Sequence, residues 1–196
     1  MGVKSLVYGV GINDMPSGII KTKEYVMWQK MIGRCFDIGV KTKQPSYLDV
    51  TCCDDWVVLS KFLSDIKSIE NFDRIYDDVA WEFDKDLLVK GNKIYSFEKC
   101  CFVPPEINKI LVTRKSERGS YPLGVSKIKG TNKYRSQISI NGKNKHLGRF
   151  SCKDDAFNAY RNEKLNLICI LANKWKSDIS NDVYNALINR DIDIND

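Results

Sequence analysis

The feature that most constrains the fold is an Asn-Gly pair at 141–142, which separates two short segments of alternating polar and apolar residues. Asn-Gly favours a two-residue hairpin turn, because both residues tolerate the positive φ angles that such a turn requires. The segments "LGVSKIK", "KYRSQISIN" and "KNKHLGRF" follow one another through "GTN" and "NGK". The sequence therefore predicts three consecutive antiparallel strands, and a sheet of this size needs a cover on one face.

The next segment, "SCKDDAFNAYRNEKLNLICILANKWK", is predicted to be the helix that provides this cover. Its apolar residues recur at three- and four-residue steps, and Lys164 is the one interruption. Ser151 or Asp154 is the expected N-cap. We therefore expect residues 121–176 to form a three-stranded antiparallel sheet packed on one long helix. Residues 177–196 are expected to start as a helix and to end as an acidic tail.

Charge is distributed unevenly along the chain of 196 residues, whose net charge is +6. Residues 113–176 hold 15 Lys and Arg against 4 Asp and Glu, whereas residues 1–112 hold 15 against 16 and residues 177–196 hold 1 against 5. A folded segment with a net charge of +11 is typical of a nucleic-acid-binding module. The alternative is a basic surface that serves only solubility.

Alternation along the strand "YRSQISI" predicts what each face of the sheet does. Ile138 and Ile140 point to one face, and Arg135, Gln137 and Ser139 point to the other. If the helix covers the isoleucine face, the opposite face is open and has the width of a β-ribbon that enters the major groove. Arg135 and Gln137 are then the candidates for reading base edges. The basic residues expected to neutralise phosphates are Lys127, Lys133, Lys143, Lys145 and Arg149.

These residues resemble the AP2 domain in its phage and homing-endonuclease version. The resemblance runs through "GVSK", "KYRSQISINGK", "KHLGRF" and "DDAFNAY" and covers most of residues 121–175. It implies a sheet packed on a helix that binds double-stranded DNA through the exposed face. The DNA-facing positions that it implies are Ser126, Gln137, Ser139, Asn144, His146, Arg149 and Tyr160. Ser126, Asn144 and His146 stand where plant members have arginine or tryptophan, which changes the expected base specificity.

The front part of the chain is predicted to be a helical scaffold followed by a strand-turn-strand-helix unit. Apolar periodicity predicts helices over residues 22–37 and 54–69, with a short strand in "PSYLDVTC" between them. From Trp81 onward the apolar runs are short, and "KGNK" predicts the turn of a hairpin. "PPEIN" then suits the first turn of a helix, because proline is favoured at that position.

The stretch "FDKDLLVKGNKIYSFEKCCFVPPEIN" resembles the HNH hairpin of phage proteins, a ββα-metal unit. With "GVGIND", "VMWQKMIGRCFD" and "PSYLDVTCCDDW", the resemblance extends over nearly all of residues 8–110. An HNH nuclease holds a divalent metal between hairpin and helix, and a histidine activates water. The resemblance places Asp84 on the hairpin ligand and Asn108 on the helix ligand, both oxygen donors that suit Mg²⁺.

The hairpin departs from the HNH pattern at its base. Lys85 stands where the family has the histidine, and a lysine with an ordinary pKa is protonated at neutral pH. Lys99 stands where the family has an asparagine that braces the loop. Asp86 is a candidate substitute, as base or as metal ligand, so the candidate catalytic residues are Asp84, Lys85 and Asp86. His146, the only histidine, is expected to contact DNA or pack beside it.

Three functions remain open at this point, for a chain predicted to be α+β with an HNH-like domain at 1–112, a linker at 113–120 and an AP2-like domain at 121–176. The leading hypothesis is a phage-type DNA-binding protein whose HNH half is degenerate and needs no cofactor. The second is an active Mg²⁺-dependent homing endonuclease or nickase. The third is a phage factor that binds a host defence or transcription complex.

The cysteines and the hydropathy indicate the compartment. Seven cysteines, an odd number, suit a reducing environment in which thiols pack as small apolar groups. The pairs at 52–53 and 100–101 admit a structural zinc, although core packing of Cys53 against Cys100 is the simpler expectation. No run of about 18 uncharged apolar residues and no signal peptide is evident. We expect a cytoplasmic protein with no membrane partner, in the host cytoplasm if a phage encodes it.

Overall fold

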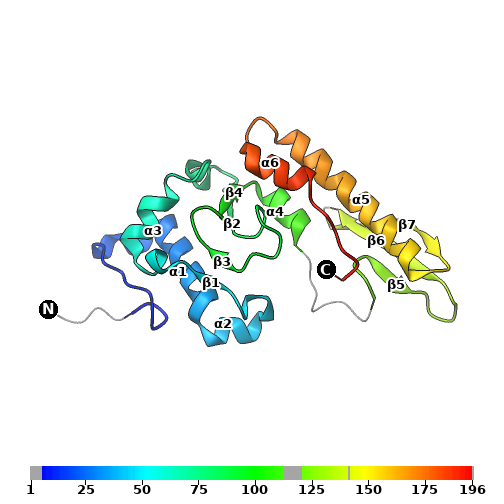
Figure 1. Cartoon of the computed structure of the whole chain (residues 1–196), viewed down its shortest axis with the longest axis horizontal. Helices are drawn as coiled ribbons and strands as arrows, with labels where there is room; N and C mark the ends of the chain where they lie inside the picture. Colours follow the sequence, from blue (N-terminus) through cyan, green and yellow to red (C-terminus); the bar gives the residue numbers. More distant parts are fainter. Residues whose placement is uncertain (1–5, 113–120, 141, 196) are drawn as a thin grey trace. The chain divides into compact units, whose positions relative to one another are not determined.

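The computed structural model describes residues 6–112, 121–140 and 142–195. It has the predicted α+β composition, with the elements distributed over two compact units, Met1–Asn108 and Lys109–Asp196. Figure 1 shows the elements of both units. The predicted linker at 113–120 and the Asn141 half of the Asn-Gly turn lie outside the described residues.

The first unit is mainly helical in its first eighty residues. The helix predicted over residues 22–37 is present as α1, and Thr22 caps it by accepting a hydrogen bond from the Tyr25 amide. The helix predicted over residues 54–69 is divided into a 3₁₀ turn and a shorter α-helix, because Val58 is extended and bridges Ile12. The helices and 3₁₀ turns are η1 (Ser17–Lys21), α1 (Lys23–Phe36), α2 (Ile38–Lys43), η2 (Pro45–Tyr47), η3 (Asp54–Val57), α3 (Leu59–Ile66) and η4 (Phe72–Tyr76).

The strands of the first unit do not form the tight hairpin that "KGNK" predicted. β2 (Glu82–Asp84) pairs antiparallel with β4 (Cys101–Val103), and α4 (Pro105–Leu111) follows directly. Between β2 and β4 the chain makes a long loop whose strand β3 (Ile94–Tyr95) pairs in parallel with β1 (Thr51–Cys52). The ββα order of β2, β4 and α4 is therefore present, but the loop between β2 and β4 is fixed by pairing with β1, which is distant in sequence.

Aromatic side chains fill the core of the first unit. Trp28 of α1 and Trp56 of η3 are fully buried, and the Trp28 Nε1 donates to the Trp56 carbonyl at 2.8 Å. Phe62 of α3 packs edge to face on Trp56, with ring centroids 5.2 Å apart. Phe102 of β4 is 1% exposed, so the strands that carry the candidate metal residues rest on a rigid base.

The second unit is the predicted three-stranded antiparallel sheet packed on one long helix (Figure 1). Ile138 and Ala156 are buried between sheet and helix, as the alternation predicted. The elements are β5 (Val125–Lys127), β6 (Tyr134–Ile140), β7 (Lys143–Phe150), α5 (Lys153–Lys174) and α6 (Asn181–Ile188).

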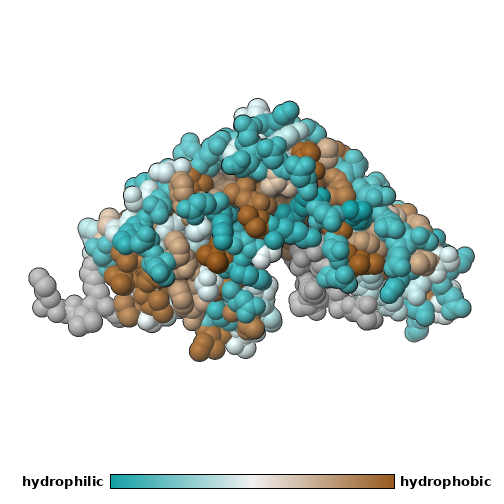
Figure 2. Space-filling view, in the orientation of Figure 1, coloured by the Kyte–Doolittle hydropathy of each residue, from teal (hydrophilic) through white to brown (hydrophobic). Residues whose placement is uncertain are grey.

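The cap of α5 and the end of the chain differ from the prediction. Cys152, rather than Ser151 or Asp154, caps α5, because its Sγ accepts from the Asp154 amide at 3.4 Å. Residues 177–195 fold back on α5 instead of forming a tail: Leu187 of α6 and Ile192 beyond it are buried. The loop that leads into α6 is mainly hydrophilic in Figure 2. No helix in the described ranges is long and apolar enough to cross a bilayer.

Candidate functional site

The sheet of the second unit has one face under α5 and one face that no described element of this unit covers. Register pairing assigns side chains to the faces, because directly opposed residues in neighbouring strands point the same way. Arg135 of β6 is opposite Ser126 on one side and Arg149 on the other. We call the following residues, all on the uncovered side, the open face: Ser126, Arg135, Gln137, Ser139, Asn144, His146 and Arg149.

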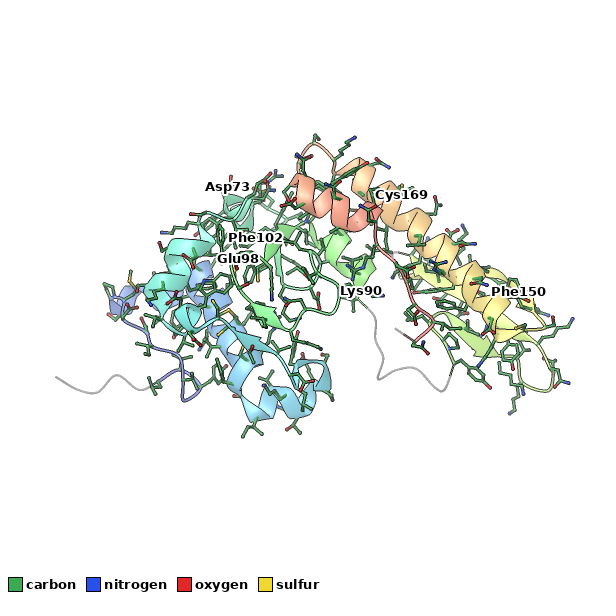
Figure 3. All side chains as sticks on the ribbon, in the orientation of Figure 1. Asp73, Lys90, Glu98, Phe102, Phe150 and Cys169 are labelled. Carbon is green, nitrogen blue, oxygen red and sulfur yellow. The ribbon has the colours of Figure 1, made fainter. Side chains whose placement is uncertain are left out.

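A β-bulge in β7 is what brings His146 and Arg149 to the same face. These residues are three positions apart, so a regular strand would point them in opposite directions. The register shifts between Ser136 and Gln137: Ser136 pairs with Gly148 and Gln137 with His146, which leaves Leu147 as the extra residue. Gly148 has φ of +138°, a conformation that suits glycine, and a Cβ there would lie 3.0 Å from the Phe150 ring. Phe150 is labelled at the end of β7 in Figure 3.

The predicted phosphate contacts divide between the two faces. Arg149 lies on the open face, and Lys133 is exposed in the β5–β6 turn. Lys127, Lys143 and Lys145 pair with Tyr134, Ile140 and Ile138, so they share the helix-covered side of the sheet. Lys145 donates to Glu163 of α5 at 2.9 Å, which holds it toward the helix. The bulge accounts for the position of Arg149, because without the extra residue Arg149 would share the helix-covered side with Lys143 and Lys145.

Tyr160 is a core residue rather than a DNA contact, which corrects the prediction for this position. Its side chain is 6% exposed on the inner side of α5. It fills the space next to Gly124, where an added Cβ would lie 2.0 Å from the tyrosine ring. Gly124, with φ of +71°, lets the chain pass under this ring and accept the Gln137 amide at its carbonyl.

In the first unit, Asp84 and Asp86 bring two carboxyl groups together at the end of β2. Asp84 Oδ1 accepts hydrogen bonds from the Asp86 and Leu87 amides at 2.8 and 2.7 Å, which closes the turn after the strand. The Asp86 carboxyl group lies within hydrogen-bond reach of the Asp84 carboxyl group. Burial, followed by the negative charge of Asp86, raises the pKa of Asp84 to about 6.

Lys85 holds the loop together instead of taking the place of a base. Its side chain is 8% exposed, and its Nζ donates to the Asn92 carbonyl and to Asp86 Oδ2, each at 3.1 Å. Asn92 returns the contact, since its Nδ2 donates to the carbonyls of Lys85 and Ile94. Asn92, not residue 99, is therefore the asparagine that braces this loop. The sequence did not predict this role of Asn92, because an asparagine in "KGNK" is also expected for a turn.

The predicted metal ligands Asp84 and Asn108 are on elements that meet, but Asn108 is engaged elsewhere. Its Nδ2 donates to the carboxylate of Glu82, which is on the same side of β2 as Asp84. Nowhere in the described ranges do three or more His, Cys, Asp or Glu side chains form a metal-binding group. Asp84 and Asp86 are therefore the oxygen donors that lie together at this end of β2, and the Lys85 ammonium already bonds one oxygen of Asp86.

Arg34 is a positively charged residue that interacts with Asp84 and that the sequence did not predict. Its Nη1 donates to the Tyr95 hydroxyl at 3.0 Å, and its guanidinium lies over the Tyr47 ring, 5.3 Å from the centroid. Burial opposes a rise in the pKa of Arg34, but the hydrogen bond from Arg34 to Tyr95 and the negative charge of Asp84 help to raise it. Arg34 belongs to α1, some fifty residues before Asp84, and no local motif links the two.

All seven cysteines are free thiols. The Cys35 and Cys52 thiols hydrogen-bond to each other. Burial raises the pKa of the Cys100 thiol, and the expected packing of Cys53 against Cys100 stays a prediction.

Comparison with known proteins found no match to this chain among family models, curated proteins or solved structures.

Proposed function

We propose that this protein binds double-stranded DNA through the open face of β5, β6 and β7. The observation that carries the proposal is the register of the sheet, which brings two arginines and five polar side chains, Ser126 included, to the side away from α5. A sheet of this width fits the major groove, where arginine and amide side chains bind base edges. The charge of +11 over residues 113–176 supports the proposal, because neutralised phosphates release counterions and strengthen binding.

Two basic residues of β7 provide a matched test. Arg149 and Lys145 are on the same strand, and replacing either by alanine removes one positive charge. Arg149 is on the open face, whereas Lys145 is bound to Glu163 on the helix side. We expect Arg149→Ala to lower the slope of log K against log salt by about 0.9, the value for one phosphate contact, and to weaken binding roughly tenfold at low salt. Lys145→Ala should change the slope by much less.

Fluorescence anisotropy with a labelled duplex at several salt concentrations measures both quantities. Equal effects of Arg149→Ala and Lys145→Ala would mean that binding depends on overall charge and not on the open face. An unaltered circular dichroism spectrum establishes that both variants remain folded. If the wild-type protein shows no salt-dependent binding to duplex DNA, the proposed function is wrong.

A second candidate function is Mg²⁺-dependent cleavage of DNA at Asp84 and Asp86. The contact between the two carboxyl groups favours it, because divalent cations are the usual partners of such pairs. Mg²⁺ bound there would stabilise the oxyanion that leaves the phosphodiester.

We expect Mg²⁺ to raise the melting temperature of the wild-type protein and to support nicking of supercoiled plasmid. Asp84→Ala should abolish both effects, whereas Asp73→Ala, an exposed carboxylate of η4 labelled in Figure 3, should leave both intact. If Mg²⁺ causes neither effect in the wild type, this candidate is wrong.

A further inference from the structure

We propose that two residues of the central strand, Arg135 and Gln137, give the open face a defined base preference: Arg135 for guanine and Gln137 for adenine. This inference rests on the proposed binding of DNA by the open face. It goes further by assigning the chemistry of the DNA site to individual positions of this chain.

The position of β6 separates base contacts from backbone contacts. β6 lies between β5 and β7, so its outward side chains are the ones nearest the floor of a groove that the sheet enters. Arg149, Asn144 and His146 are on the edge strand β7, nearer the groove wall where the phosphates are. Among the open-face residues of β6, only Arg135 is charged, and Gln137 and Ser139 are neutral.

The contact that Arg135 makes on the open face is compatible with binding to guanine. Its Nε donates to Ser126 Oγ of β5 at 3.4 Å, which directs the guanidinium along the face and leaves its two terminal nitrogens for a ligand. Those nitrogens form the parallel pair of donors that matches O6 and N7 of guanine, the two acceptors of that base in the major groove. Arg149 of β7 is directly opposite Arg135 and adds positive electrostatic potential on the side of β6 away from Ser126.

Gln137 presents different chemistry two residues further along the strand. The β-bulge places His146 opposite it in β7, and the next pair is Ser139 with Asn144. No Lys, Arg, Asp or Glu belongs to this end of the open face. A glutamine amide has one donor and one acceptor side by side, which matches N7 and N6 of adenine and no other base in the major groove.

The spacing along the strand sets the spacing in the DNA. Residues two apart on one face of a strand are about 6.8 Å apart, because the rise is about 3.4 Å per residue. Base pairs are about 3.4 Å apart along each strand of the duplex. Arg135 and Gln137 therefore address bases roughly two positions apart, and the face as a whole covers about four or five base pairs.

Selection of bound duplexes from a random library, with the full-length protein, tests this assignment. We expect the wild type to enrich a short motif with a guanine about two positions from an adenine. Arg135→Ala should lose the guanine preference alone, Gln137→Ala the adenine preference alone, and each should bind the wild-type motif roughly tenfold more weakly. Arg149→Ala should bind the same motif with lower affinity. Gln137→Arg should exchange the adenine preference for a guanine preference. A misfolded protein could not produce this gain of a new preference.

The outcomes separate this inference from the proposed function. Binding without an enriched motif would overturn the base preference and leave DNA binding in place. A motif that Arg135→Ala and Gln137→Ala leave unchanged would mean that other residues read the bases. Absence of any duplex binding would overturn both statements.

Discussion

At the scale of single residues, Asp84 is the group whose ionisation costs the fold most clearly. Burial and the neighbouring Asp86 charge raise its pKa from 3.8 to about 6, and two backbone amides only partly compensate. The folded protein therefore binds this proton more tightly than the unfolded chain does. The corresponding stability is fully present below about pH 4 and is lost as the pH rises through about 6.

We predict that Asp84→Asn stabilises the protein at pH 7.5. The amide keeps an oxygen that accepts the Asp86 and Leu87 amides but has no charge to bury. The gain should be about 2 kcal/mol, since one pKa unit corresponds to about 1.4 kcal/mol and the carboxyl group keeps some solvent contact. The difference from wild type should disappear at pH 4. Urea denaturation at the two pH values measures it, with Asp73→Asn as the control. A less stable Asp84→Asn protein at pH 7.5 would contradict the assigned cause.

At the scale of elements, the features predicted correctly are those that depend on hydrophobic periodicity within one segment of the chain. Alternation in β6 and three- and four-residue periodicity in α5 identified the sheet, its cover and the faces of Arg135 and Gln137. The phase of β7 could not be predicted from alternation, because one extra residue at Leu147 reverses it. The glycine within "HLGRF" was the available signal, since glycine inside a strand marks a bulge.

Pairing between distant segments accounts for the other element that was predicted wrongly. "KGNK" has a local turn preference, yet β3 after it pairs with β1, more than forty residues earlier. The same long-range arrangement brings Arg34 toward Asp84 and turns Lys85 inward to the Asn92 carbonyl. The residue types of the candidate metal site were therefore predictable from sequence, whereas its supporting contacts depend on tertiary pairing.

At the scale of the whole molecule, the chain has two units with separate buried cores. Each unit has a group that is charged near neutral pH and whose charge burial disfavours: Asp84 in the first unit and Lys164 in the second. Lys164 interrupts the apolar side of α5 and is 8% exposed. Burial, followed by the positive charge of Arg190, lowers its pKa to about 8. The charged lysine therefore destabilises the fold below about pH 8, and this cost is relieved as the pH rises toward 10.5.

We predict that the two units unfold in separate calorimetric transitions at pH 7. Lys164→Met keeps most of the side-chain volume and removes the buried charge, so it should stabilise the second unit by about 2 kcal/mol. Because 1 kcal/mol corresponds to about 4–8 °C in domains of about this size, only the second unit's transition should rise, and by several degrees. Asp84→Asn should raise only the other transition. Tryptophan fluorescence assigns them, since Trp28, Trp56 and Trp81 are in the first unit and Trp175 is in the second. A single transition that both substitutions shift would mean that the two cores unfold as one cooperative unit.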